Sequence, residues 1–103
     1  MGRWAQRRRS GGGNGQPAGA VLSIVGFTAH SSGSYKITYN GPINVAILNP
    51  VDFVSNPSGE VGATIVQLTA TELEWANDAT NNTDTEIVYS GSAPFVQSPQ
   101  TFP

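Results

Sequence analysis

Tyr35-Lys-Ile-Thr-Tyr39, followed directly by Asn40-Gly41, is the stretch that decides the fold class. Apolar and polar residues alternate strictly along its first five positions, which is the pattern of a half-buried β-strand. Asn-Gly is the dipeptide that best tolerates the positive φ angles of a tight hairpin turn. We therefore predict a hairpin in which Ile43–Asn49 is the return strand and Pro42 lengthens the loop.

Short β-prone segments of the same kind lie on both sides of this hairpin, separated by clusters of Gly, Pro, Ser and Asn. Gly26, within the first of them, indicates a bulge or a close backbone approach. Asn56-Pro-Ser-Gly59 is a strong turn signal, because Pro fixes φ at the second position and Gly suits the fourth. The further predicted strands are Val21–Thr28, Val51–Val54 as an edge segment, Val61–Ala70, Glu86–Tyr89 and Ala93–Gln97 as an edge strand.

Thr71-Glu-Leu-Glu-Trp75 is a segment whose pattern fits two structures. As a strand, it points Leu73 and Trp75 inward and its two Glu side chains outward. As a short helix, it begins with a capping box, because a Thr precedes each Glu by three residues. The extended segments on both sides favour the strand.

About six to eight short strands, with turns every eight to twelve residues, predict an all-β fold that is a small antiparallel β-sandwich or barrel. By composition, the 103 residues divide into a basic, Gly-rich, flexible N-terminal arm at 1–19, a β-sandwich body at 20–97 and an extended tail at 98–103. The N-terminal arm holds every Arg, whereas all seven carboxylates lie beyond it. This charge separation predicts that the arm docks against an acidic protein surface.

The residue types that catalysis and metal binding require are scarce. Cys is absent, which excludes disulfides and thiolate-bound metals, and His30 is the single histidine. Glu72 and Glu74 are interpreted as a solvated pair on one strand face. Oxygen-bearing side chains alternate along 78–86 as in a calcium loop, but the glycine and the last glutamate of such a loop are missing. We predict no enzyme, no catalytic residue, no cofactor and no metal site. No run of about 20 apolar residues occurs, so no membrane partner is expected.

The N-terminal arm supplies the candidate site residues. Arg3, Trp4, Arg7, Arg8 and Arg9 are predicted to bind a partner protein, because Arg and Trp dominate the energetics of protein interfaces. Two alternatives stay open. In one, the arginines contact nucleic-acid phosphates, without a basic surface on the body to assist them. In the other, the arm is a solubilising segment.

The layout of the whole chain resembles small virion structural proteins of tailed bacteriophages. The shared features are a short Arg- and Gly-rich arm, a Lys-poor and Cys-free β body and a Pro-containing tail, and capsid decoration or cement proteins are the most similar type. The resemblance implies a structural protein of the virion that stabilises the capsid by bridging neighbouring capsid subunits. The implied partners are the major capsid protein or another virion protein, and further copies of the chain in a homo-oligomer. The alternatives are a tail or head–tail component and a nucleic-acid-binding module that acts through the arm.

A second resemblance concerns the body. Leu73-Glu-Trp75 and Glu86-Ile-Val-Tyr-Ser90 resemble paired strands of fibronectin type III or immunoglobulin-like modules, which implies an immunoglobulin-like sandwich. Little chain follows Ser90 in which to complete such a fold in its usual order, so the sequence leaves the strand order open.

Overall fold

A computed structural model describes the protein at residues 21–77 and 82–103. Over these ranges the chain forms strands and short 3-10 turns, as predicted for an all-β protein. The elements are β1 (Ile24–Ala29), β2 (Ser34–Tyr39), η1 (Val45–Ile47), η2 (Pro50–Asp52), β3 (Phe53–Asn56), β4 (Glu60–Gln67), β5 (Glu72–Asn77), β6 (Glu86–Tyr89) and β7 (Gln100–Phe102).

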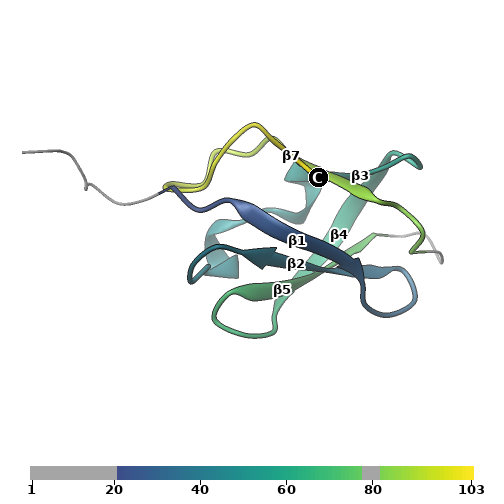
Figure 1. The fold of residues 1–103 in the computed structure, drawn as a ribbon, viewed down its shortest axis with the longest axis horizontal. Helices are drawn as coiled ribbons and strands as arrows, with labels where there is room; N and C mark the ends of the chain where they lie inside the picture. The colour runs from purple at the N-terminus through teal and green to yellow at the C-terminus, as the bar shows by residue number, and fades with distance from the viewer. Residues whose placement is uncertain (1–20, 78–81) are drawn as a thin grey trace, which may run out of the picture.

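The strands form an antiparallel sheet in the order β1-β2-β5-β4-β3-β6-β7, rolled into a nearly closed barrel (Figure 1). The sheet turns at β4, which pairs with β5 along most of its length and with β3 at its first residues. The resulting layers, β1-β2-β5-β4 and β3-β6-β7, have the strand grouping of a constant-type immunoglobulin sandwich. The predicted antiparallel sandwich or barrel is confirmed, and the short chain after Ser90 completes it with β7.

The edge strands β1 and β7 are joined through a side chain. The side-chain amide of Gln100 donates to the carbonyl oxygen of Ile24 (3.1 Å) and accepts from its N–H (3.0 Å), so it takes the place of a peptide group. Just before β1, Leu22 forms a parallel bridge with Val96. These contacts shield sheet edges that would otherwise be open to pairing with other chains.

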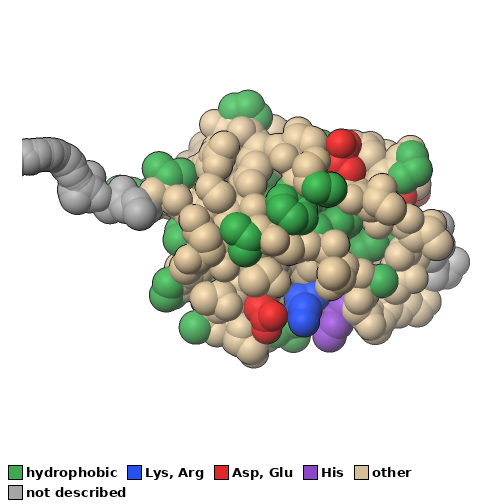
Figure 2. Space-filling view, viewed as in Figure 1, with side chains coloured by type: hydrophobic (Ala, Val, Ile, Leu, Met, Phe, Trp, Pro, Cys, Tyr) green, Lys and Arg blue, Asp and Glu red, His purple; other side chains and the backbone are tan. Residues whose placement is uncertain are grey.

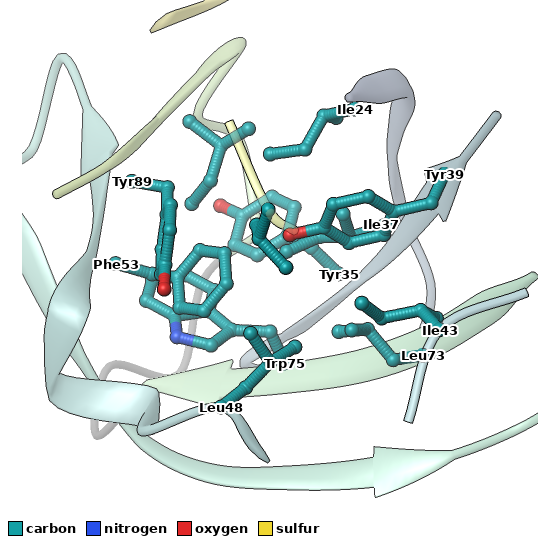
Figure 3. Packing of buried hydrophobic residues seen from close by; sticks show 12 residues of the cluster. Ile24, Tyr35, Ile37, Tyr39, Ile43, Leu48, Phe53, Leu73, Trp75 and Tyr89 are labelled. Carbon is teal, nitrogen blue, oxygen red and sulfur yellow. The ribbon is translucent and has the colours of Figure 1, made fainter. Parts of the chain in front are cut away.

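Aromatic and aliphatic side chains fill the barrel, and the ring of Trp75 lies close to those of Tyr35 and Phe53 (Figure 3). The ring centroid of Trp75 lies 6.1 Å from that of Tyr35 and 6.3 Å from that of Phe53. These separations lie within the range at which aromatic pairs add stability beyond their buried area. The indole N–H of Trp75 donates to the carbonyl oxygen of Pro50 (3.0 Å), so its polar atom is satisfied inside the core. The other buried apolar residues are Ile24, Ile37, Tyr39, Ile43, Leu48, Leu73, Ile87, Tyr89 and Val96.

Several local predictions are confirmed. Buried and partly exposed residues alternate along β2, β5 and β6, so the segment at 71–75 is a strand and not a helix. The register of β1 against β2 shifts between Ile24 and Gly26, which is the predicted bulge. Gly59 closes the predicted turn at 56–59 with a φ of 75°. At these places the local pattern and the tertiary pairing favour the same backbone conformation.

The predicted hairpin after Tyr39 is wrong. Asn40-Gly41 does not adopt the positive φ angles that such a turn needs, and β2 pairs instead with β1 and β5. Ile43–Asn49 contains η1 rather than a strand. The side chains of Asn44 and Asn49 cap η1 and η2 by accepting an N–H two residues on, at 3.0 and 3.2 Å. Such local side-chain bonds compete with a strand ladder.

Three other segments differ from the predictions in their pairing. Val51–Val54 is not an edge segment, because its first half lies in η2 and its second half begins β3, which lies between β4 and β6. Ala93–Gln97 is not a strand, and of its residues Val96 makes a single bridge. Residues 98–103, predicted as an extended tail beyond the body, contribute β7 to the sheet. Each difference depends on how the segment pairs with residues that are distant in sequence, and such pairing cannot be predicted from the local sequence pattern.

Two of the core tyrosines, Tyr39 and Tyr35, provide a test of this packing. The Tyr39 hydroxyl is buried and has no hydrogen-bond partner among the described residues. Its pKa is raised mainly by burial and, to a smaller extent, by the nearby Tyr89. The Tyr35 hydroxyl instead accepts from the backbone N–H of Asp84 (2.9 Å). We expect Tyr39→Phe to leave the free energy of unfolding unchanged or raise it by up to about 1 kcal/mol, and Tyr35→Phe to lower it by about 1–3 kcal/mol. Urea unfolding measures both changes. A loss above about 1 kcal/mol for Tyr39→Phe would contradict this packing.

Candidate interaction surface

The predicted partner-binding residues of the N-terminal arm lie outside the described residues. They are Arg3, Trp4, Arg7, Arg8 and Arg9. Part of the calcium-like stretch at 78–86 also lies outside the described residues. Within the part of the chain that the structure describes, no group of three His, Cys, Asp or Glu residues could hold a metal ion. The exposed side chains of the body provide the candidate interaction surface.

Charged side chains of the body form a short row on the outer face of β2 and β5, visible along one edge of Figure 2. Lys36 Nζ lies 3.5 Å from Glu72 Oε2, and His30 Nε2 lies 3.8 Å from Glu74 Oε2. Glu74 also accepts from the Ser34 hydroxyl (2.9 Å). The two carboxylates lie on one open sheet face, as predicted, and each has its own partner. Exposed pairs of this kind contribute at most about 1 kcal/mol.

Asp84 is a buried carboxylate that fastens the turn between β3 and β4. It accepts from the Ser55 hydroxyl (2.6 Å), from the Ser58 N–H (3.0 Å) and from the Ser58 hydroxyl. Burial raises the pKa of Asp84, but the side-chain bonds from Ser55 and Ser58 and the backbone bond from Ser58 outweigh it, so the pKa lies below its ordinary value. Three hydrogen bonds from Ser55 and Ser58 join the carboxylate to β3 and to the turn at 56–59, which indicates a structural role.

Large apolar side chains are exposed at several positions of the body. Figure 2 shows exposed apolar side chains and few charged ones on one face of the molecule. Such exposure marks interaction surfaces when the side chains lie close together. The exposed residues are Val21, Val25, Ile47, Val51, Val61, Val66, Leu68 and Phe95. The strand register places two subsets of them in defined groups.

The first group, here named the apolar tip, consists of Val21 and Phe95. The bridge of Leu22 with Val96 sets Val21 beside Phe95, on the opposite side from the buried Val96. Phe95 is 68% exposed and has a φ of 62°, a left-handed conformation that is strained for a bulky residue. Strain of this kind concentrates at functional positions. The available sequence signal was Pro94, because Pro at the second position of a type II turn places the next residue at positive φ.

The second group, here named the valine face, is a row across the outer side of β4, β3, β6 and β7. Val61, Val54, Val88 and Thr101 are direct cross-strand neighbours. The residues next to them along β3 and β6 are buried, so the row points away from the core. Sequence reasoning missed this row, because its members come from four strands whose order was unknown.

Comparisons with known proteins concern the fold. No protein-family model matches the sequence, and no curated protein matches it. Among solved structures, the chain is similar to the N-terminal part of the bacterial S-layer protein SbsC, with a TM-score of 0.63 and 18% identity. The match covers 82% of this chain and 23% of that chain. No helix in the described part of the chain is long and apolar enough to cross a membrane. The likeness to SbsC therefore shows that the all-β fold of the body also occurs in the N-terminal part of a bacterial S-layer protein.

Proposed function

We propose that the protein is a non-catalytic structural component of a phage particle, a decoration protein that stabilises the capsid by bridging neighbouring capsid subunits. The observation that carries the proposal is the apolar tip, where Phe95 is both strained and exposed. A soluble domain gains nothing from holding a phenyl ring in water at the cost of backbone strain, whereas burial of the ring in a partner makes the arrangement favourable.

The composition of the surface supports the same function. Charged residues make up 12% of the sequence, about half the usual share in soluble domains. A body whose surface is covered in an assembly does not need many charges for solubility. The likeness to part of a bacterial S-layer protein is compatible with this proposal and concerns the fold alone.

Substitution of Phe95 tests the proposed function. Phe95→Gly and Phe95→Asn remove the ring with residues that tolerate the left-handed conformation. We expect each variant to bind undecorated capsids at least tenfold more weakly, while the free energy of unfolding stays unchanged or rises by up to about 1 kcal/mol. Co-sedimentation with shells assembled from the major capsid protein of the phage that encodes the chain measures binding, and urea unfolding measures stability.

Val66→Thr is the matched control, because Val66 is 50% exposed on β4 and lies outside the apolar tip. It should bind like the unchanged protein. Failure of the unchanged protein to sediment with shells contradicts the decoration function. Sedimentation with purified tails would instead favour the tail or head–tail alternative, and retention on DNA at about 150 mM salt would favour the nucleic-acid alternative.

A further inference from the structure

The valine face has the chemistry of a docking surface. Val61 is 47% exposed, and Val54 and Val88 are partly exposed beside it. Thr101 extends the row onto β7. Four cross-strand neighbours at the usual strand spacing of about 4.8 Å form a β-branched strip roughly 14 Å long. A strip of this kind is suited to an aromatic ring and to the aliphatic stems of long side chains.

An open hollow with a carboxylate in its wall adjoins the valine face. Its volume is about 270 Å³, and it is lined by Asn56, Pro57, Thr85 and Glu86. Glu86 lies two residues before Val88 on the same outer side of β6. Its Oε1 accepts from Asn56 Nδ2 (2.8 Å), and no cation lies within ion-pair distance among the described residues. The second carboxylate oxygen can therefore accept from a guanidinium.

Charge and position identify the occupant. Every Arg of the chain lies within 3–9, with Trp4 among them, and Lys36, the single Lys, is already paired with Glu72. The chain enters the body at Val21, beside Phe95, and Ile24 is bonded to Gln100 of β7. The valine face therefore begins close to the place where the N-terminal arm joins the body. An Arg at 3–9 is at least 12 residues from Val21, a reach on the order of 40 Å when extended.

We propose that the segment Arg3–Arg9 docks on the valine face of its own body. Trp4 lies over the valines, and an arginine enters the hollow to bind Glu86. Two bare valine faces do not pair with each other in this proposal, because each brings an uncompensated carboxylate to the contact. Because only residues 10–20 separate the segment from the body, the segment stays at a millimolar effective concentration near its own face, which favours docking within one chain. This inference does not depend on the capsid function.

Fluorine NMR of the full chain labelled with 5-fluorotryptophan tests the docking. The protein has two Trp residues, so Trp75 reports the fold and Trp4 reports the docked segment. We expect the Trp4 resonance to differ from that of a synthetic peptide of residues 1–17. Val61→Lys and Glu86→Lys should each move it most of the way to the peptide position, as should about 1 M salt, because they remove the apolar or the ionic contact.

Matched variants make the outcome decisive. Val66→Lys, outside the valine face, should leave the Trp4 resonance unchanged. Combining Glu86→Lys with Arg7→Glu, Arg8→Glu and Arg9→Glu should restore the docked position. An unchanged Trp75 resonance shows that each variant is folded. The proposal is overturned if the Trp4 resonance of the unchanged protein has the same position as that of the synthetic peptide. A position that varies with protein concentration from about 20 µM to 1 mM assigns the segment to a second copy and overturns docking within one chain.

Discussion

Gly62→Ala is expected to lower the free energy of unfolding by about 3 kcal/mol or more, a large fraction of the total stability of a domain of this size. Gly62 is buried in β4, directly against the central tryptophan. A Cβ at this position would lie 2.0 Å from Trp75 Nε1 and 2.4 Å from the carbonyl oxygen of Pro50. Because these two atoms form the hydrogen bond of the indole, the added methyl group must displace both the ring and η2. The cost therefore combines overpacking with a lost buried hydrogen bond.

Thermal and urea unfolding measure this effect, and Gly59→Ala is the matched control. Gly59 has a φ of 75° and no heavy atom within 4 Å of a Cβ, so alanine there costs only the left-handed backbone penalty of about 1 kcal/mol. The two variants make the same chemical change and separate crowding from backbone strain. If Gly62→Ala proves no more destabilising than Gly59→Ala, the close approach of β4 to Trp75 is wrong.

Strands with a clear alternation were predictable from the sequence, and the connections between them were not. Alternation identified β2, β5 and β6, because the two faces of these strands meet different environments. It also suggested a strand at Ile43–Asn49, where apolar residues recur but Asn44 and Asn49 cap 3-10 turns instead. The contact by which Gln100 joins β7 to β1 could not be predicted from the local sequence. A glutamine whose side chain replaces a peptide group has the same sequence pattern as one that lies in solvent.

The candidate interaction surface, like the fold, was predictable from the sequence only in part. The charge of the N-terminal arm is a property of composition, so the sequence identified Arg3–Arg9 as the segment to test. The valine face is a property of register: Val54, Val61 and Val88 are far apart in sequence and become neighbours only through the order β4-β3-β6. Phe95 is intermediate, because Pro94 implies a turn, while the exposure of the ring follows from the burial of Val96.

Asp84→Asn is expected to lower the free energy of unfolding by about 2 kcal/mol at pH 7, because the charged acceptor of three hydrogen bonds from Ser55 and Ser58 is lost. The folded pKa of Asp84 lies below its ordinary value, so the folded state binds this proton less readily than the unfolded state. The stabilisation is therefore fully present above the unfolded pKa of about 4. It is lost as the pH falls through the folded pKa.

Urea unfolding between pH 7 and pH 2 checks this assignment. The difference in stability between the unchanged protein and Asp84→Asn should be largest at neutral pH and should shrink below about pH 4. Glu72→Gln is the control, since Glu72 belongs to an exposed ion pair with Lys36 and should cost less than about 1 kcal/mol. Because β3, the turn at 56–59 and the start of β6 all meet at Asp84, its carboxylate fixes the end of the valine face that holds the hollow. A constant difference from pH 7 to pH 2 would mean that the carboxylate does not provide this charged anchor.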